Sequence, residues 1–269
     1  NGTVSHDSIR TNVIILDSLD LYKYIVGGTF FSIDSGFEFK LNPKEVRLNY
    51  EDWNVPADNY IRLGGDKIVI QNVELVNGVE RITLESKAQA GTPIYVGFRE
   101  LNLEYLSSMV AQEQTLTGLL HGDINLYPEK DNFHFTSQLA IQKFSMAEIP
   151  WGDIGLSVNQ NELNRYDVNF SLTGNGNNIR AAGYYSAGDK PSINLTTTIS
   201  QFNLGALQPI VAAQVEDLKG ILSGQIVVEG SPQKPKIDGK IWFRNTHFLS
   251  TYLNTAFNIT EENISFGPQ

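Results

Sequence analysis

Apolar and polar residues alternate with a period of two along most of the chain. The clearest runs cover residues 31–41, 133–141 and 166–172, where large apolar side chains alternate with polar or charged ones. Successive side chains of a strand point to opposite faces, so this pattern predicts strands with one buried face. We expect the apolar residues of 31–41 to share one side, up to Asn42-Pro43. The pattern as a whole predicts an all-β protein.

A half-buried hairpin is predicted between Gly220 and Phe243. Residues 225–228 are a short β-favouring run, and residues 236–243 alternate between apolar and charged positions. Glycine and proline separate the two runs at Gly230-Ser231-Pro232, as expected for a turn. A different pattern covers Leu101–Gln112, whose apolar residues follow helical spacing over about three turns.

Part of this hairpin and the helical pattern before it occur twice in the chain. Matching residues of 102–111 recur in 203–212 at a constant offset of 101, and those of 116–124 recur in 218–226 at an offset of 102. Repeated supersecondary units stack along one axis. We therefore predict one continuous domain with three parts: a strand-rich segment (1–97), a first unit of helix plus strands (98–199) and a truncated second unit (200–269).

Two folds fit the alternation. A β-sandwich would bury the apolar faces of two sheets against each other, whereas a single elongated, curled sheet would line a groove with its apolar face. The repeat and the small number of helices favour the curled sheet with two short α-helices. An apolar face of this length exceeds the few hundred Å² of a typical surface patch, which predicts that it binds something. Acyl chains of lipids are the expected ligand.

Composition narrows the function classes. The formal net charge is −10 and no basic stripe is present, so we expect no nucleic acid partner. There is no cysteine, which removes disulfides and thiolate chemistry. The sequence starts without Met and has no apolar run long enough to span a membrane, so we interpret it as a segment of a longer protein.

Candidate catalytic chemistry is sparse. His6, His121, His134 and His247 are scattered without a second ligand at metal spacing. No nucleophile elbow and no phosphate-binding or dinucleotide-binding glycine motif is present. We predict that the protein is not an enzyme and uses no metal or cofactor.

The pattern G-x-L-x-G-x-I-x-V-x-G-S-P-x-x-P-x-I-x-G-x-I-x-F at Gly220–Phe243 resembles the repeat of TamB and related AsmA-like proteins, the translocation and assembly module of diderm bacteria. Residues 259–266 look like the strand that follows it in the family. The first unit is a degenerate copy, and Trp53, Asn59 and Ile61 carry a weaker resemblance near the N-terminus.

The resemblance implies a periplasmic protein of the cell envelope, with an inner-membrane anchor outside this segment. It implies a β-taco, a U-shaped groove with an apolar inner face. It also implies a role in phospholipid transport between the two membranes. A second implied role is as a scaffold or chaperone that inserts outer-membrane β-barrel proteins with a BamA-like partner. A surface adhesin or carbohydrate-binding solenoid is a third candidate. On the resemblance, the groove wall consists of Ile124, Leu126, Phe133, Phe135, Leu139, Ile141, Tyr166, Val168, Phe170, Leu172, Ile193, Leu195, Ile226, Val228, Ile237, Ile241 and Phe243.

Overall fold

The computed structural model describes residues 2–5, 7–34, 36–65, 67–86, 92–106, 115–128, 133–162 and 164–267. The chain forms two compact units: unit 1 comprises Asn1–Gln112 and Leu119–Thr136, and unit 2 comprises Glu113–Gly118 and Ser137–Gln269. Most of the described residues lie in antiparallel strands, which confirms the all-β class. The part boundaries after residues 97 and 199 stay a prediction.

Unit 1 contains a seven-stranded sheet in the order β1-β2-β3-β4-β6-β7, in which β5 pairs with β4. Four further strands, β8 to β11, pair in chain order. The strands are β1 (Gly2–Ser5), β2 (Ser8–Leu16), β3 (Tyr22–Ile33), β4 (Gly36–Leu48), β5 (Glu51–Trp53), β6 (Tyr60–Gly64), β7 (Lys67–Gln71), β8 (Val73–Asn77), β9 (Glu80–Ser86), β10 (Ile94–Asn102) and β11 (Leu116–Pro128).

The core of unit 1 is built around Trp53, which is buried together with Leu101 and Val73. The Trp53 ring meets Tyr105 edge to face with centroids 5.5 Å apart. Asn59 is buried nearby, and its side chain accepts from the Leu41 N–H (2.8 Å) and donates to the Leu41 carbonyl (2.9 Å). A buried amide needs such partners, because an unpaired polar group costs about 1–3 kcal/mol. Trp53 and Asn59, two of the residues that carry the weaker N-terminal resemblance, are therefore core residues of unit 1.

The expectation for residues 31–41 was wrong in one respect. A tight turn after Ile33 separates β3 from β4, and Ile33 pairs with Gly36 across it. Phe30 pairs with Phe39, whereas Phe31 pairs with Glu38, so Phe31 and Phe39 face opposite sides of the sheet. The turn inserts a reversal that the period-two pattern does not reveal. Strand β4 also continues through Pro43 to Leu48 instead of ending there.

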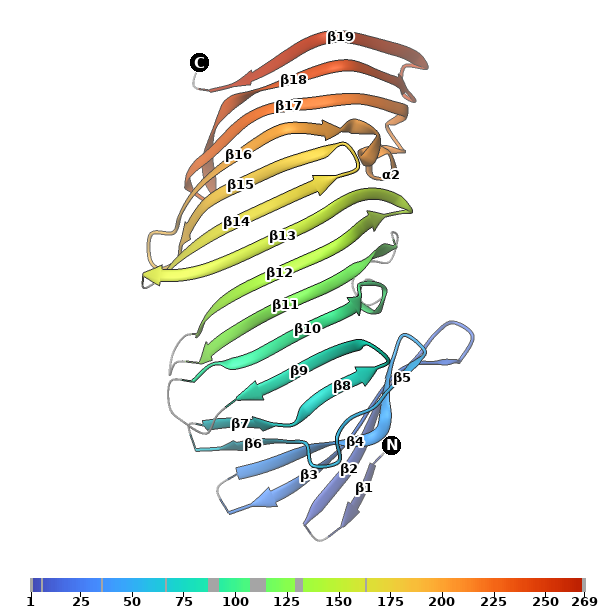
Figure 1. Ribbon diagram of the computed structural model, residues 1–269, viewed down its shortest axis with the longest axis vertical. Coiled ribbons are helices and arrows are strands. Elements are labelled where there is room, and N and C mark those ends of the chain that lie inside the picture. The colour runs from blue at the N-terminus through green and yellow to red at the C-terminus, as the bar shows by residue number, and fades with distance from the viewer. Residues whose placement is uncertain are drawn as a thin grey trace. The chain divides into compact units, whose positions relative to one another are not determined.

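Unit 2 contains eight strands that pair in chain order from β12 to β19 (Figure 1). Among its described residues they form a single open sheet, because no pairing joins β12 to β19. The strands are β12 (Phe133–Met146), β13 (Ile149–Glu162), β14 (Arg165–Gly174), β15 (Asn177–Ser186), β16 (Ser192–Asn203), β17 (Val215–Ser231), β18 (Lys234–Ser250) and β19 (Thr255–Phe266). The hairpin predicted at Gly220–Phe243 is confirmed as β17 and β18.

Helical structure is confined to short segments. A 3-10 helix, η1 (Leu204–Leu207), leads directly into α2 (Gln208–Val211), where the repeat places the second helix. The first helix was predicted over Leu101–Gln112, but Leu101 and Asn102 end strand β10, and within that range only residues 104–106 are described as helical. Residues 107–112 lie outside the described residues.

The two copies of the repeat share their backbone irregularities. Between β10 and β11 the register shifts after Phe98↔Gly122, and between β16 and β17 it shifts after Ile199↔Gly224. These positions differ by the same offsets of 101 and 102 found in the sequence. Asn102 accepts a hydrogen bond from the N–H of Glu104 (3.1 Å), and Asn203 accepts one from Gly205 (3.0 Å). Each copy therefore ends its strand with the same bulge and the same asparagine cap.

Candidate functional site

The candidate site is one face of the unit 2 sheet, which we call the apolar face. Residues directly opposite in antiparallel strands share a face, so the pairing register links side chains into rows across all eight strands. One row is Leu139, Leu156, Phe170, Ala181, Thr197, Ile226, Gly239 and Phe266. The next is Ile141, Ile154, Leu172, Ile179, Ile199, Gly224, Ile241 and Ile264. A third is Ser137, Val158, Val168, Gly183, Leu195, Val228 and Ile237.

The opposite face of the same strands is mostly polar. A row on that face is Ser157, Asn169, Ala182, Thr196, Val227 and Asp238. Another is Asn159, Asp167, Tyr184, Asn194, Glu229 and Lys236. The sheet thus separates apolar and polar side chains as the alternation predicts for a sheet with one solvated face.

The register brings together the groove residues that were predicted in unit 2. They are Leu139, Ile141, Tyr166, Val168, Phe170, Leu172, Ile193, Leu195, Ile226, Val228, Ile237, Ile241 and Phe243. In unit 1, Ile124 and Leu126 face the same side as Val96 and Ile94 of β10. Phe135 lies half-buried in β12. Phe133 is the first residue of β12, and the structure describes its backbone but not its side chain.

Several members of the apolar face were not predicted from sequence. Strand β13 contributes Ile154, Leu156 and Val158. Each pairs with a predicted residue of β14, and Ile154 and Leu156 also pair with predicted residues of β12. Their period-two spacing after Gly152 was a usable signal. Ile179 and Ala181 of β15 are harder to find, because small and polar residues interrupt the alternation there.

Burial varies along the apolar face. Leu172 is only 2% exposed, whereas Ile237 near the β17–β18 turn is 46% exposed. Most other members are half-buried. A face packed against a second sheet would be buried throughout. This face is therefore partly open to solvent.

The most buried part of the apolar face lies where η1 packs against it. Leu204 and Ala206 of η1 form a cluster with Leu172, Ile199 and Phe202. Around this cluster pack Ile149, Trp151, Ile154, Phe170, Ile179, Leu207, Leu218, Leu222 and Phe243. The helical segment thus covers one end of the apolar face.

Two polar side chains hold the helical segment in place. Buried Asn177 donates to the Trp151 carbonyl (2.7 Å) and accepts from the Asn203 N–H (2.9 Å). Gln208 donates to the Val215 carbonyl and accepts from the Leu218 N–H, both at 2.8 Å. The Asn177 bonds join β13, β15 and β16, and the Gln208 bonds join the start of α2 to β17.

A cavity of about 430 Å³ opens on the apolar face beside η1. Its wall consists mostly of apolar side chains: Leu204, Val215, Leu218, Phe243, Thr246, Phe248, Ile259, Glu262 and Ile264. Phe248 and Phe257 stack with centroids 5.1 Å apart at its far side, on β18 and β19. The cavity can accept an apolar group but offers few hydrogen-bond partners to a polar one.

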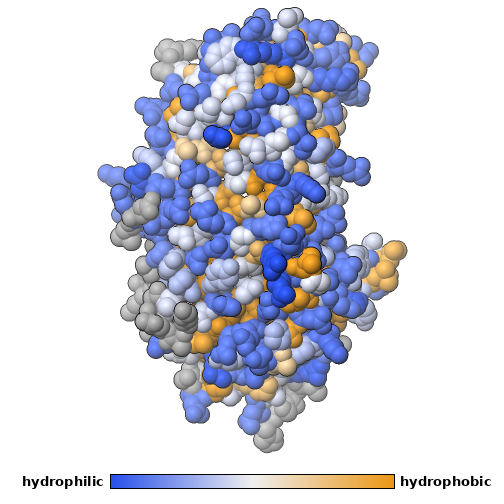
Figure 2. All heavy atoms as spheres, in the orientation of Figure 1, coloured by the Kyte–Doolittle hydropathy of each residue, from blue (hydrophilic) through white to orange (hydrophobic). Residues whose placement is uncertain are grey.

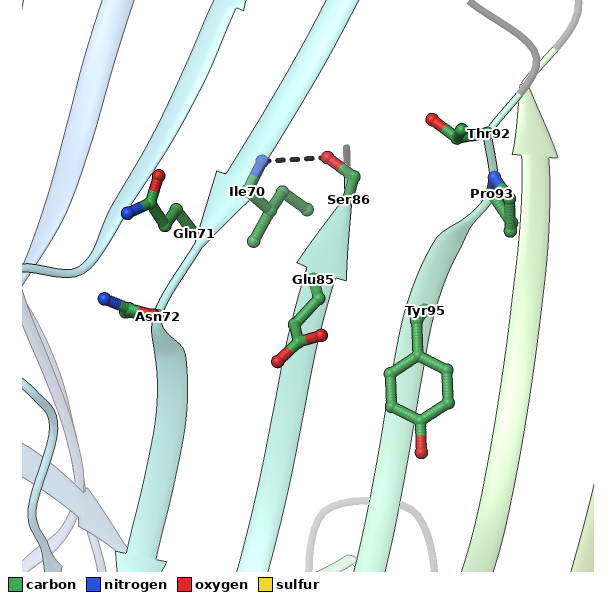
Figure 3. A pocket seen from close by; sticks show the side chains of 8 residues that line it. All are labelled: Ile70, Gln71, Asn72, Glu85, Ser86, Thr92, Pro93 and Tyr95. Carbon is green, nitrogen blue, oxygen red and sulfur yellow. Dashed lines mark hydrogen bonds between the residues drawn. The ribbon is translucent and has the colours of Figure 1, made fainter. Parts of the chain in front are cut away.

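A larger cavity of about 540 Å³ belongs to unit 1 and is chemically different (Figure 3). It is lined by Ile70, Gln71, Asn72, Glu85, Ser86, Thr92, Pro93 and Tyr95. The Ser86 hydroxyl accepts a hydrogen bond from the Ile70 N–H (2.8 Å). The wall of this cavity mixes polar and apolar groups. These residues form no nucleophile–base pair. The apolar face remains the stronger candidate.

Most ion pairs in the described parts of the chain lie at the surface, whereas Glu38, which pairs with Arg62 and Lys40, is buried. His247 lies 3.3 Å from Asp217 and 2.8 Å from the Asn258 oxygen. No group of three potential metal ligands occurs among the described residues. No helix within them is both long enough and apolar enough to cross a membrane.

Comparison with known proteins agrees with the repeat and the fold. A family model described as TamB, N-terminal domain, matches residues 82–242, more than half of the chain. The match covers all or most of the strands from β9 to β18, and with them most of the apolar face. No curated protein and no solved structure matches the chain. The chain belongs to the TamB family.

Proposed function

We propose that the apolar face of unit 2 binds the acyl chains of phospholipids, as part of a periplasmic bridge that carries lipid from the inner to the outer membrane. The observation that carries this proposal is the pairing register, which aligns apolar side chains in rows across eight strands while leaving most of them half-buried. The association of the TamB family with the cell envelope supports it.

The energetics favour an acyl chain as the ligand. Each methylene removed from water contributes about 0.8 kcal/mol, so a chain lying along several residues of one row gains several kcal/mol without specific polar contacts. A cavity of about 430 Å³ exceeds the roughly 30 Å³ of one water molecule many times over. Its apolar wall makes water a poor occupant.

The β-sandwich alternative requires a second sheet on the same face. Within the described part of unit 2 the strands form one sheet, and the segment from η1 to α2 covers one end of it. Exposure of Ile237, Ile264 and Phe266 argues further against a packed partner sheet over β18 and β19.

Two adjacent residues of β17 provide a matched test. Ile226 belongs to the apolar face and Val227 to the polar face, and both are half-buried. Ile226→Asp should lower the phospholipid that co-purifies with the protein at least about fivefold, because a carboxylate in the row opposes acyl contact. Val227→Asp should leave it unchanged. Mass spectrometry of extracted lipid gives the measurement, with an unrelated β-sandwich as the background.

The midpoint of urea unfolding of each variant shows whether a loss of lipid reflects weaker binding or loss of the folded state. Phe170 is a poorer choice for substitution because it packs against the buried cluster around Leu172. If Ile226→Asp unfolds the protein while Val227→Asp does not, the apolar face is ordinary core. Lipid at background level in the wild type would also overturn the proposal.

A second candidate function rests on strand β19. It pairs with β18 and with no other described strand, and most of its residues are exposed. The edge of a sheet can accept an extended polypeptide by strand addition. On this alternative the chain is a scaffold for insertion of outer-membrane β-barrel proteins with a BamA-like partner. In both candidates we propose that the protein acts by binding and not as an enzyme.

A further inference from the structure

The end of the β2–β3 hairpin exposes a dense set of apolar side chains. We call residues 13–24 the hairpin tip. Leu19 is 76% exposed, Val13 is 61% exposed and Leu16 is 45% exposed. Ile14, Ile15, Leu21 and Tyr22 are also exposed. In Figure 2 the hairpin tip projects at the right and shows hydrophobic residues in orange at the surface.

Both faces of the hairpin tip are apolar. Val13 and Ile15 pair with Val26 and Tyr24 on one face, where Val13 and Ile15 are exposed while Tyr24 is buried and donates a hydrogen bond to the Tyr105 carbonyl (3.2 Å). On the other face Ile14 pairs with Ile25, and Leu16 pairs with Tyr22. A flat surface or a stacked sheet can cover only one face of a two-stranded hairpin. An occupant that buries both faces must therefore enclose the tip in a cleft.

The turn of the hairpin tip is ordered by its own hydrogen bonds. The Asp17 carboxylate accepts from the N–H groups of Leu19 (2.8 Å) and Leu21 (2.9 Å), and its second oxygen accepts from the Tyr50 hydroxyl (2.7 Å). The Tyr50 hydrogen bond and the backbone N–H of Leu21 hold the pKa of Asp17 below its usual value, so this carboxylate is charged at neutral pH. Leu19 is thus presented in one defined position, which lowers the entropy that binding must overcome.

Charge limits the nature of the occupant. The turn carries Asp17 and Asp20, while the nearest cation, Lys23, lies over the Tyr24 ring at 5.7 Å. In a bilayer core an aspartate costs about 2.5–3.5 kcal/mol and each large aliphatic residue returns only about 0.3–0.6 kcal/mol. Two aspartates therefore outweigh the apolar residues of the tip. A second copy of the chain, with its net charge of −10, is also a poor match.

We propose that the hairpin tip is a docking element for another protein, one that offers an apolar cleft with lysine or arginine at its rim. The cleft encloses Leu19 and the exposed apolar side chains on both faces of the tip, and the basic rim pairs with the carboxylates of Asp17 and Asp20. This inference is independent of the lipid proposal, because it rests on residues of unit 1 only.

Photo-crosslinking tests the proposal in the full chain. A photoreactive phenylalanine analogue replaces Leu19, and as a matched control it replaces Leu253, a 57% exposed residue in the β18–β19 turn of unit 2. In cells of the species that encodes the protein, we expect a protein adduct at position 19 and none at 253. The crosslinked peptide of the partner should contain apolar residues next to lysine or arginine.

Affinity measurements with the purified partner complete the test. Leu19→Ser should weaken binding at least tenfold, and Leu253→Ser should not change it. Asparagine tolerates the positive φ of 60° at position 20, so Asp20→Asn should leave the turn intact. This variant should weaken partner binding about threefold and make the affinity less dependent on salt. Adducts with lipid or with a second copy, or equal adduct yields at 19 and 253, would overturn the proposal.

Discussion

Gly239 shows how a single residue shapes the apolar face. It lies opposite Ile226 in the pair β17–β18, and its φ is +143°. A Cβ at this position would lie 2.2 Å from the Gln225 carbonyl oxygen. Gly224 has a similar φ and the same conflict with the Lys240 carbonyl. These glycines let two strands approach where a side chain would separate them.

Substitution of Gly239 should therefore cost more than backbone strain alone. We expect Gly239→Ala to lower the free energy of unfolding by about 3–5 kcal/mol, since strain of about 1–3 kcal/mol adds to a backbone clash. Gly230→Ala is the control, because its φ is +99° but no atom lies within 4 Å of the added Cβ. Urea unfolding followed by circular dichroism measures both. Equal losses for the two variants would contradict the role given to the close approach.

At the scale of elements, β19 separates the two candidate functions. Strand addition to β19 depends on backbone hydrogen bonds, whereas acyl binding depends on side chains of the apolar face. Proline substituted singly along β19 removes one N–H at a time. Positions whose N–H points away from β18 leave the β18 pairing intact, so these variants stay folded.

The two functions predict opposite results for these folded variants. If the edge recruits an unfolded β-barrel polypeptide, proline in β19 should lower its binding at least about tenfold, and Ile226→Asp should have no effect. If the apolar face binds lipid, the same proline variants should retain wild-type lipid. Pull-down of an unfolded outer-membrane β-barrel protein and lipid mass spectrometry on the same preparations decide between them.

At the scale of the whole molecule, most charged side chains of unit 2 lie off the apolar face, although Glu262 pairs with Phe243 on it. The chain has 30 acidic and 20 basic residues, yet the three rows of the apolar face described above contain none of them. Salt bridges such as Arg165–Asp167 and Arg62–Glu38 lie away from these rows. Salt screens charge interactions but hardly weakens apolar contact.

Lipid retention should consequently be insensitive to ionic strength. We expect the co-purified phospholipid to change less than about twofold between 50 mM and 500 mM NaCl, concentrations chosen to shorten the Debye length from above about 10 Å to below it. Partner binding at the hairpin tip should fall over the same range. A tenfold loss of lipid at high salt would indicate headgroup recognition by charged side chains instead of acyl contact.

Sequence alone determined the strand content, the β17–β18 hairpin, the repeat and the apolar side of most single strands. These features are local, because the period of two follows from the geometry of one extended backbone. The repeated asparagine cap at Asn102 and Asn203 is local in the same sense. The alternation could not reveal the reversal after Ile33, since a tight turn leaves the period of two unbroken on either side of it.

Only the tertiary structure decided which strands are neighbours, how deeply their faces are buried and where apolar surface is left uncovered. The register that joins Leu139 to Phe266 across eight strands is a non-local property, and so is the cover that η1 provides over Leu172. The fully apolar run Val13–Leu16 belongs to strand β2, yet its side chains are exposed. Burial depends on what packs against a side chain, and a sequence pattern carries no record of that neighbour.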